Sequence, residues 1–245
     1  MSLNLSNNLI FDRNLLSIRR AKAANSLTKA NFLIKRSFAD IQEKLSEMNR
    51  EFPMILNLGN GYSSINGSIH IITDEENPPF ATNQFNLIIS ILNLHLVNDL
   101  PGCLIRLKDS LKPNGILIAS LFGGDNLPQL RETLIKTELQ IFAGISPRIN
   151  PSIEIKQLGG LLQRAGFTSP VIDRDCVEVH YKNPIDLLHD LQNMSETNIL
   201  IGRNKKYLGK KFWQKFSENY RHSYRVNEKE VSANFEILTL MAIKP

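Results

Sequence analysis

Short apolar runs alternate with helical patterns along the middle of this chain, and this order is the feature that most restricts its fold. Residues 85–92 are almost wholly apolar, residues 100–111 carry leucines at helical spacing, and residues 116–121 form a second apolar run. Apolar runs without polar alternation are typical of strands that are buried on both faces of a parallel sheet. Because parallel strands need crossover connections, which are usually helices, the order predicts an α/β fold with a mostly parallel sheet.

A glycine-rich turn follows the first predicted strand. Residues 54–58 form a short apolar run that leads into Gly59 and Gly61, and residues 69–72 form a second candidate strand soon afterwards. Glycine has no side chain, so such a turn lets the backbone bend sharply or approach a ligand closely. Taken alone, the turn fits both a simple tight turn and a ligand site.

The first part of the chain carries a different pattern. Apolar residues recur at intervals of three and four over residues 14–48, with many basic residues between them. This periodicity predicts a helix with one apolar face. We therefore expect a basic helical lead-in over residues 1–50, followed by the α/β domain over residues 51–245.

The last part of the chain predicts an edge pair of strands and a cap. Residues 171–181 and 235–243 contain strand-like apolar segments, which we expect to pair antiparallel at one edge of the sheet. Residues 184–221 between them are polar and helical in pattern. Ligands of open α/β sheets bind beyond the carboxyl ends of the strands, so we expect this insertion, with residues 123–151, to form a cap there.

Composition restricts the class of protein and its partners. The 245 residues are 42% hydrophobic, which is enough for a substantial core. The net charge of +5 comes largely from basic runs near both ends. Such runs are more often solvated helix faces than nucleic-acid sites, so we do not expect nucleic acid as a partner. The two cysteines suggest neither a disulfide framework nor a metal site, and no apolar run is long enough to span a membrane.

Six longer strings of residues resemble one protein family. They lie at residues 10–13, 94–101, 121–125, 146–148, 161–167 and 190–196. The family is methyltransferase-like and contains the mitochondrial complex I assembly factor that modifies an arginine, its alphaproteobacterial relatives and, more distantly, the malonyl-carrier-protein methyltransferase of biotin synthesis. The resemblance covers nearly the whole chain, and it implies the Rossmann-like fold of class I S-adenosylmethionine-dependent methyltransferases.

The resemblance also implies which residues would hold S-adenosylmethionine. Gly59 and Gly61 would let the backbone approach the methionine and ribose part of the cofactor. Asp74 begins a segment similar to the family's adenine-binding element, with Glu75 beside it, and Asn93 after the next strand would face the sulfonium end. The acidic residues fit a solvated loop equally well.

The segment that would carry the cofactor is short for the family. Twelve residues separate Gly61 from Asp74, whereas a single helical crossover needs about that many on its own. We therefore expect a sheet that is truncated on the cofactor side. If residues 69–72 form the adenine-side strand, no residue remains to clasp the ribose. If they form the ribose-side strand, Asp74 or Glu75 takes that role and the adenine pocket loses its wall.

Three further residues are candidates for contacts with a substrate. His95 follows an apolar strand and is either a packed histidine or a catalytic base. Asp125 precedes a predicted helix and is either its N-cap or a substrate contact. Arg148 is either a residue at the mouth of the site or a surface charge, and its sequence context does not decide between the two.

Two classes of function follow from the resemblance. In the first, the chain is an S-adenosylmethionine-dependent methyltransferase that acts on a protein side chain or a small carboxylate substrate, mainly by positioning it. In the second, it is a catalytically silent or hydroxylase-like assembly factor for a respiratory complex and acts through protein binding. Fold alone does not separate them. A composition rich in asparagine, isoleucine and lysine favours a bacterial, cytoplasmic member.

Overall fold

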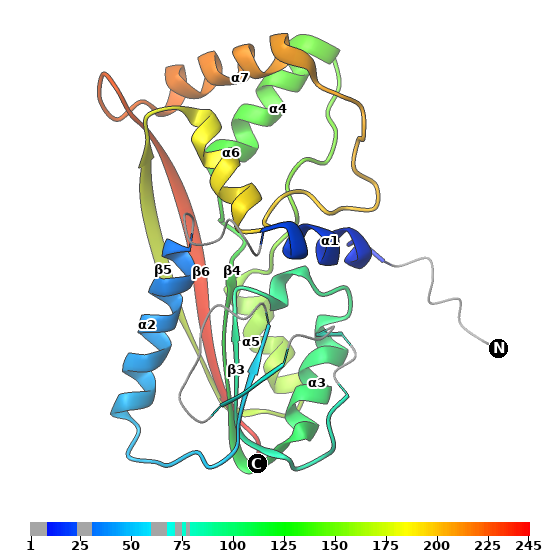
Figure 1. The fold of residues 1–245 in the computed structure, drawn as a ribbon, viewed down its shortest axis with the longest axis vertical. Coiled ribbons are helices and arrows are strands. Elements are labelled where there is room, and N and C mark those ends of the chain that lie inside the picture. The colour runs from blue at the N-terminus through cyan, green and yellow to red at the C-terminus, as the bar shows by residue number, and fades with distance from the viewer. Residues whose placement is uncertain (1–8, 24–30, 60–67, 72–74, 77–78) are drawn as a thin grey trace, which may run out of the picture. The chain divides into compact units, whose positions relative to one another are not determined.

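The computed structural model describes residues 9–23, 31–59, 68–71, 75–76 and 79–245. The chain divides into two compact units, and Figure 1 labels their helices and the strands β3 to β6. One, called here the helical unit, contains Met1–Asn31, Asp125–Pro151 and Cys176–Phe235. The other, called the sheet unit, contains Phe32–Gly124, Ser152–Asp175 and Glu236–Pro245.

Within the described residues, six strands form one sheet in the order β2-β1-β3-β4-β6-β5. The strands are β1 (Ile55–Leu58), β2 (Ser68–Ile71), β3 (Phe85–Ile91), β4 (Leu111–Phe122), β5 (Thr168–Tyr181) and β6 (Val231–Ile243). Strand β1 pairs in parallel with β2 and β3, β3 pairs in parallel with β4, and β4 pairs antiparallel with β6. The predicted α/β fold with a mostly parallel sheet is therefore confirmed.

Strand β4 begins earlier than the sequence predicts. Phe85 of β3 pairs with Leu111, but Leu87 pairs with Ile116, so the intervening residues of β4 form a bulge. Asn114 in this bulge has a φ of 61°, a conformation that asparagine tolerates better than most residues. Pro113, Asn114 and Gly115 are residue types typical of a turn, but here they lie inside a longer strand, because the bulge absorbs the turn-forming conformation.

The sheet unit packs three helices around the strands: α2 (Phe32–Glu47), α3 (Leu100–Ser110) and α5 (Ile155–Arg164). Strands β1, β3 and β4 and helices α3 and α5 share one core, in which Leu56, Leu104, Leu117 and Leu158 are fully buried. Gly166 follows α5 with a φ of 86°, a left-handed conformation in which glycine commonly ends a helix. These elements hold the carboxyl ends of β1, β3 and β4 in fixed register.

Ion pairs attach α2 to β5 within the sheet unit. Arg36 Nε lies 2.5 Å from Asp175 Oδ2, and Lys44 Nζ lies 2.6 Å from Asp173 Oδ2.

The prediction of one helix over residues 14–48 is wrong. Asn31 is not helical, and α2 is separate from α1 (Arg13–Ala23). The two helices also belong to different units.

The helical unit contains α1 and three later helices: α4 (Pro128–Phe142), α6 (Pro184–Asn193) and α7 (Gly209–Tyr224). Buried Asn219 on α7 donates from Nδ2 to Thr137 Oγ1 at 3.0 Å and to Gln140 Oε1 at 2.9 Å, which joins α7 to α4. Nearly all of the predicted cap belongs to this unit. Its position over the carboxyl ends of the strands stays a prediction.

Candidate functional site

The carboxyl ends of β1 and β3 bring a glycine and an asparagine side by side. Gly59 directly follows β1, and Asn93 lies two residues beyond β3. A Cβ placed on Gly59 would lie 2.1 Å from Asn93 Nδ2, and Gly59 has a φ of 137°. Other residues rarely adopt this conformation, and none of their side chains would fit here. This position therefore requires glycine, because a side chain would collide with Asn93.

The asparagine is held firmly in place. Asn93 is 2% exposed, and its Nδ2 donates a hydrogen bond to the carbonyl of Ile91 at 2.7 Å. Leu92 between them has a φ of 48°, and its N–H donates to the Ser120 carbonyl on β4 at 2.9 Å. A left-handed leucine costs about 1–3 kcal/mol and persists only where its surroundings hold it. The backbone after β3 is thus fixed so that the Asn93 amide lies against Gly59.

The acidic segment after β2 is attached to the start of α3. The Cys103 Sγ donates to the Glu75 carbonyl at 3.1 Å, and Glu76 Oε1 accepts a hydrogen bond from the backbone N–H of Asn98. Glu75 is completely buried, which does not fit a solvated loop at this position. Gly61 and Asp74, the other predicted cofactor residues of this region, lie outside the described residues.

The histidine after β3 is packed. His95 lies in the short 3-10 helix Leu94–Leu96, is 7% exposed, and its ring meets Phe122 edge to face with centroids 5.0 Å apart. This is the environment expected of a packed histidine rather than of a base that reaches a substrate. His95 nevertheless lies only two residues from Asn93, in the same unit.

Two carboxylates that the sequence analysis missed lie at the end of β4. A Cβ on Gly123 would be 2.2 Å from Glu236 Oε2, and a Cβ on Gly124 would be 2.1 Å from Glu154 Oε1. Glu236 is 6% exposed and forms an ion pair with Arg174. A signal for Glu236 was present in the sequence, because it is the one charged residue of a 13-residue strand. Glu154 gave no comparable signal.

Asp125 does not cap the helix that follows it. The N-cap of α4 is Leu127, with a φ of 53° and no side-chain hydrogen bond to the helix, and Asp125 is exposed. The N-cap interpretation of Asp125 is therefore wrong. Pro128 at the start of α4 lacks an N–H, which removes one of the donors that a cap would satisfy.

Arg148 forms a largely buried ion pair in the helical unit. Its Nη2 lies 2.7 Å from Glu138 Oε1, and the two side chains are 13% and 3% exposed. The backbone N–H and the hydroxyl of Ser146 also donate to Glu138. Burial raises the pKa of Glu138. The hydrogen bonds from Ser146 and the positive charge of Arg148 lower this pKa by a larger amount, so it lies below the ordinary value. Arg148 is therefore not a solvated surface charge.

Of the predicted site residues, the sheet unit contains Gly59, Glu75, Asn93 and His95, whereas Asp125 and Arg148 belong to the helical unit. No group of three or more histidine, cysteine, aspartate or glutamate residues in the described part of the chain could hold a metal ion. No helix in that part is long and apolar enough to cross a membrane.

Known proteins resemble this chain in sequence and in fold. Residues 57–119 match the family described as a methyltransferase domain. The mitochondrial arginine-hydroxylase NDUFAF5 of Homo sapiens is 33% identical over 96% of this chain and 77% of its own length. The chain belongs to the NDUFAF5 family. A malonyl-[acyl-carrier protein] O-methyltransferase of Gallionella capsiferriformans is 30% identical over 71% of the chain and 58% of its own length.

The fold of this chain is similar to those of solved proteins that have low sequence identity to it. The YcgJ protein of Bacillus subtilis matches with a TM-score of 0.55 and 11% identity, over 86% of this chain and 98% of its own length. A putative methyltransferase of Bacillus halodurans matches with a TM-score of 0.52 and 12% identity, over 83% of this chain and 96% of its own length, so the methyltransferase-like fold implied by the sequence resemblance is confirmed. S-adenosylmethionine is the cofactor of this domain class. Gly59, Asn93 and Glu75 stay the predicted contacts of its methionine, sulfonium and ribose parts.

Proposed function

We propose that the chain is an S-adenosylmethionine-dependent enzyme that transfers a methyl group to a protein side chain. The observation that carries this proposal is the contact between Gly59 and Asn93 at the carboxyl ends of β1 and β3. Ligands of open α/β sheets bind at this edge, where the strand order changes direction. A bare backbone and a fixed amide lie together there, as a cofactor with a charged sulfonium end requires.

Each residue of this edge has a role in the proposal. The backbone of Gly59 would receive the methionine part of the cofactor, and the Asn93 amide would face its sulfonium end. Strand β2 is the direct neighbour of β1, which supports the ribose-side alternative, so Glu75 or Asp74 would clasp the ribose hydroxyls. The cofactor supplies an electrophilic methyl group, and the chain's own residues mainly hold the two reactants in line and exclude water.

Calorimetric titration tests the cofactor part of the proposal. We expect S-adenosylmethionine to bind the wild-type protein with measurable heat and Asn93→Ala to bind it more weakly, by about tenfold if the amide makes one charge-assisted contact. Gly160→Ala is the matched control, because Gly160 lies in α5 with no atom within 4 Å of an added Cβ. Absence of binding to the wild type at millimolar ligand would leave only a scaffold function.

For the acceptor, we propose an arginine side chain of a protein. The support is the 33% identity to a protein named as an arginine-hydroxylase, together with the carboxylates of Glu154 and Glu236 at the end of β4. Carboxylates attract a guanidinium and would repel a carboxylate substrate. Incubation with S-adenosylmethionine and arginine-containing peptides, followed by mass spectrometry, tests this choice. Unmodified arginine peptides beside a methylated malonyl carrier protein would contradict it.

Hydroxylation of arginine is the second candidate, and the same relative favours it. This reaction inserts one oxygen atom into a C–H bond, so dioxygen or another oxidant and a source of two electrons would have to be added. The mass readout separates the two reactions, because methyl transfer adds one CH₂ and hydroxylation adds one oxygen atom. The bacterial, cytoplasmic setting that composition favours remains part of the proposal.

A further inference from the structure

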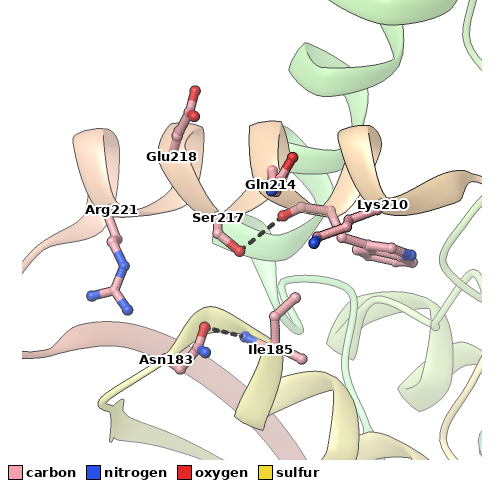
Figure 2. Close-up of a pocket in the computed structure, with 8 residues that line it drawn as sticks. Asn183, Ile185, Lys210, Gln214, Ser217, Glu218 and Arg221 are labelled. Atoms are coloured by element: carbon pink, nitrogen blue, oxygen red, sulfur yellow. Dashed lines mark hydrogen bonds between the residues drawn. The ribbon is translucent and has the colours of Figure 1, made fainter.

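A groove in the helical unit lies between the start of α6 and one face of α7, remote in sequence from the residues of the cofactor edge. Figure 2 shows its lining residues, which come from Asn183 and Ile185 on one side and from α7 on the other. Its volume is about 590 Å³, which lies within the range of about 300–1,000 Å³ that ligand sites in proteins usually have. Nothing in the proposed methyl transfer uses this groove.

Two cations stand at opposite ends of the groove. Figure 2 shows Lys210 near the start of α7 and Arg221 near its end, both on the side toward Asn183 and Ile185. The acidic residue of the lining, Glu218, points to the other side of α7 in the same view, and its carboxylate lies 3.1 Å from Lys215 Nζ. The charge that faces the groove is therefore mainly positive.

The positive character continues past the end of α7. A second depression of about 340 Å³ is lined by Arg221, His222, Arg225 and Glu228. Arg221 lines both depressions, so they form one track with Lys210, Arg221 and Arg225 along it. A track of this kind complements a ligand that carries several negative charges spaced along its length.

The groove also has an apolar part, close to Lys210. Trp213 lines it, and its ring packs edge-on against Phe212 and Phe216, with centroids 5.1 Å and 5.6 Å apart. Ile185 provides a half-buried apolar side chain on the opposite side. Apolar side chains held by aromatic neighbours, beside positively charged ones, are typical of sites that bind an amphipathic segment of a protein.

We propose that this groove binds an extended, acidic segment of a partner protein. Two carboxylates of the segment pair with Lys210 and Arg221, and an apolar side chain between them packs on Trp213. The eleven helical steps from Lys210 to Arg221 span about 16 Å at 1.5 Å per residue. An extended strand covers that length in about five residues at 3.3 Å each, which sets the spacing of the two carboxylates.

The chain offers a specific reporter for this interaction. Trp213 is its single tryptophan, so tryptophan emission reports on the groove alone. The probe is a synthetic peptide with paired glutamates at each end, about five residues apart, and leucine and alanine between them. We expect a saturable change in Trp213 emission that weakens as salt is raised, because the charges involved are exposed. A peptide with lysines in place of the glutamates should cause no change.

Charge-removing variants locate the binding site. We expect Lys210→Gln and Arg221→Gln each to weaken binding by about threefold to fivefold, the usual value of one exposed ion pair, and the double variant to weaken it further. Lys211→Gln is the matched control, because Lys211 is also an exposed α7 lysine but does not line the groove. Its affinity should stay within about twofold of the wild type. Circular dichroism confirms that every variant is folded.

Three results would overturn the proposal. The first is an unchanged Trp213 emission at saturating peptide. The second is an equal loss of affinity in Lys211→Gln and Lys210→Gln, which would show unspecific attraction to a basic helix. The third is a larger emission change with vesicles of anionic phospholipid than with the peptide, which would show that the groove faces a membrane surface instead of a protein.

Discussion

Replacing Gly59 with alanine perturbs the candidate cofactor edge in a way that can be calculated from the structure. The backbone at this residue has a φ of 137°, and a non-glycine residue held in such a region costs about 1–3 kcal/mol. The new Cβ would lie 2.1 Å from Asn93 Nδ2 and 3.0 Å from its Cγ, so the amide must move. That movement breaks the bond from Nδ2 to the Ile91 carbonyl, which is worth about 1 kcal/mol. Gly59→Ala should therefore destabilise the fold by about 2–4 kcal/mol.

A double-mutant cycle separates the two contributions. In an Asn93→Ala background the clash and the hydrogen bond are already absent, so Gly59→Ala should cost only the backbone strain of about 1–3 kcal/mol. The two single variants and the double variant should thus show a coupling energy of about 1 kcal/mol. Urea unfolding followed by circular dichroism measures all four free energies. Gly160→Ala, which meets no atom within 4 Å, should be neutral or more stable by up to about 1 kcal/mol.

The refuting results are specific. An equal cost of Gly59→Ala in both backgrounds would show that Asn93 does not lie against Gly59. A cost no greater than that of Gly160→Ala would show that Gly59 does not have the left-handed conformation. If the cycle behaves as expected and Gly59→Ala still binds S-adenosylmethionine like the wild type, the contact is real but is not part of a cofactor site.

Further outcomes concern the helical unit. Arg148→Ala should destabilise the protein by about 3 kcal/mol in urea unfolding, because it leaves Glu138 charged and buried with only Ser146 as a donor. The Arg36 side chain is 55% exposed, so Arg36→Ala should cost no more than about 1 kcal/mol in the same assay. Because the pKa of Glu138 is lowered in the folded state, its contribution to stability should be complete above its ordinary value of 4.5 and be lost as the pH falls through the lower folded value. Glu138→Gln should flatten the unfolding free energy over that acidic range, and an unchanged slope would contradict the assignment. Asn219→Ala should cost about 1–3 kcal/mol in thermal or urea unfolding, since it removes two hydrogen bonds to α4, one of them to the buried Thr137.

The strands were predictable because a strand that is buried on both faces has an almost uninterrupted run of apolar residues. Residues 85–92 have almost no polar side chains, and the structure places a strand at Phe85–Ile91. The start of β4 was not predictable from local pattern. Proline, asparagine and glycine together indicate a turn, and whether the turn ends a strand or becomes a bulge depends on pairing with β3.

The candidate site was predictable where it depends on residues that directly follow a strand. Gly59 and Asn93 could be found in this way, because parallel strands end at one edge of the sheet. Glu236 stands out in the sequence as the one charged residue of its strand, but neither Glu236 nor Glu154 could be placed beside the glycines after β4, because they come from segments distant in sequence. For Asp125 the sequence predicted a role that the structure does not show. Aspartate is typical of N-caps, but α4 begins without a side-chain cap.

The order of the strands decides between the two alternatives that the short segment before Asp74 left open. Strand β2 pairs directly with β1 along Ile55–Leu58, so it takes the place of the ribose-side strand, and no strand lies beyond it in the described residues. In our proposal, Gly59 and Asn93 hold the reactive end of the cofactor, whereas no strand of the described residues forms a wall on the adenine side. Contacts to the adenine that are equally strong in the bound complex and in the transition state lower the KM for the cofactor without raising kcat. We therefore expect a sheet shortened on this side to weaken cofactor binding more than it impairs the positioning of the methyl group.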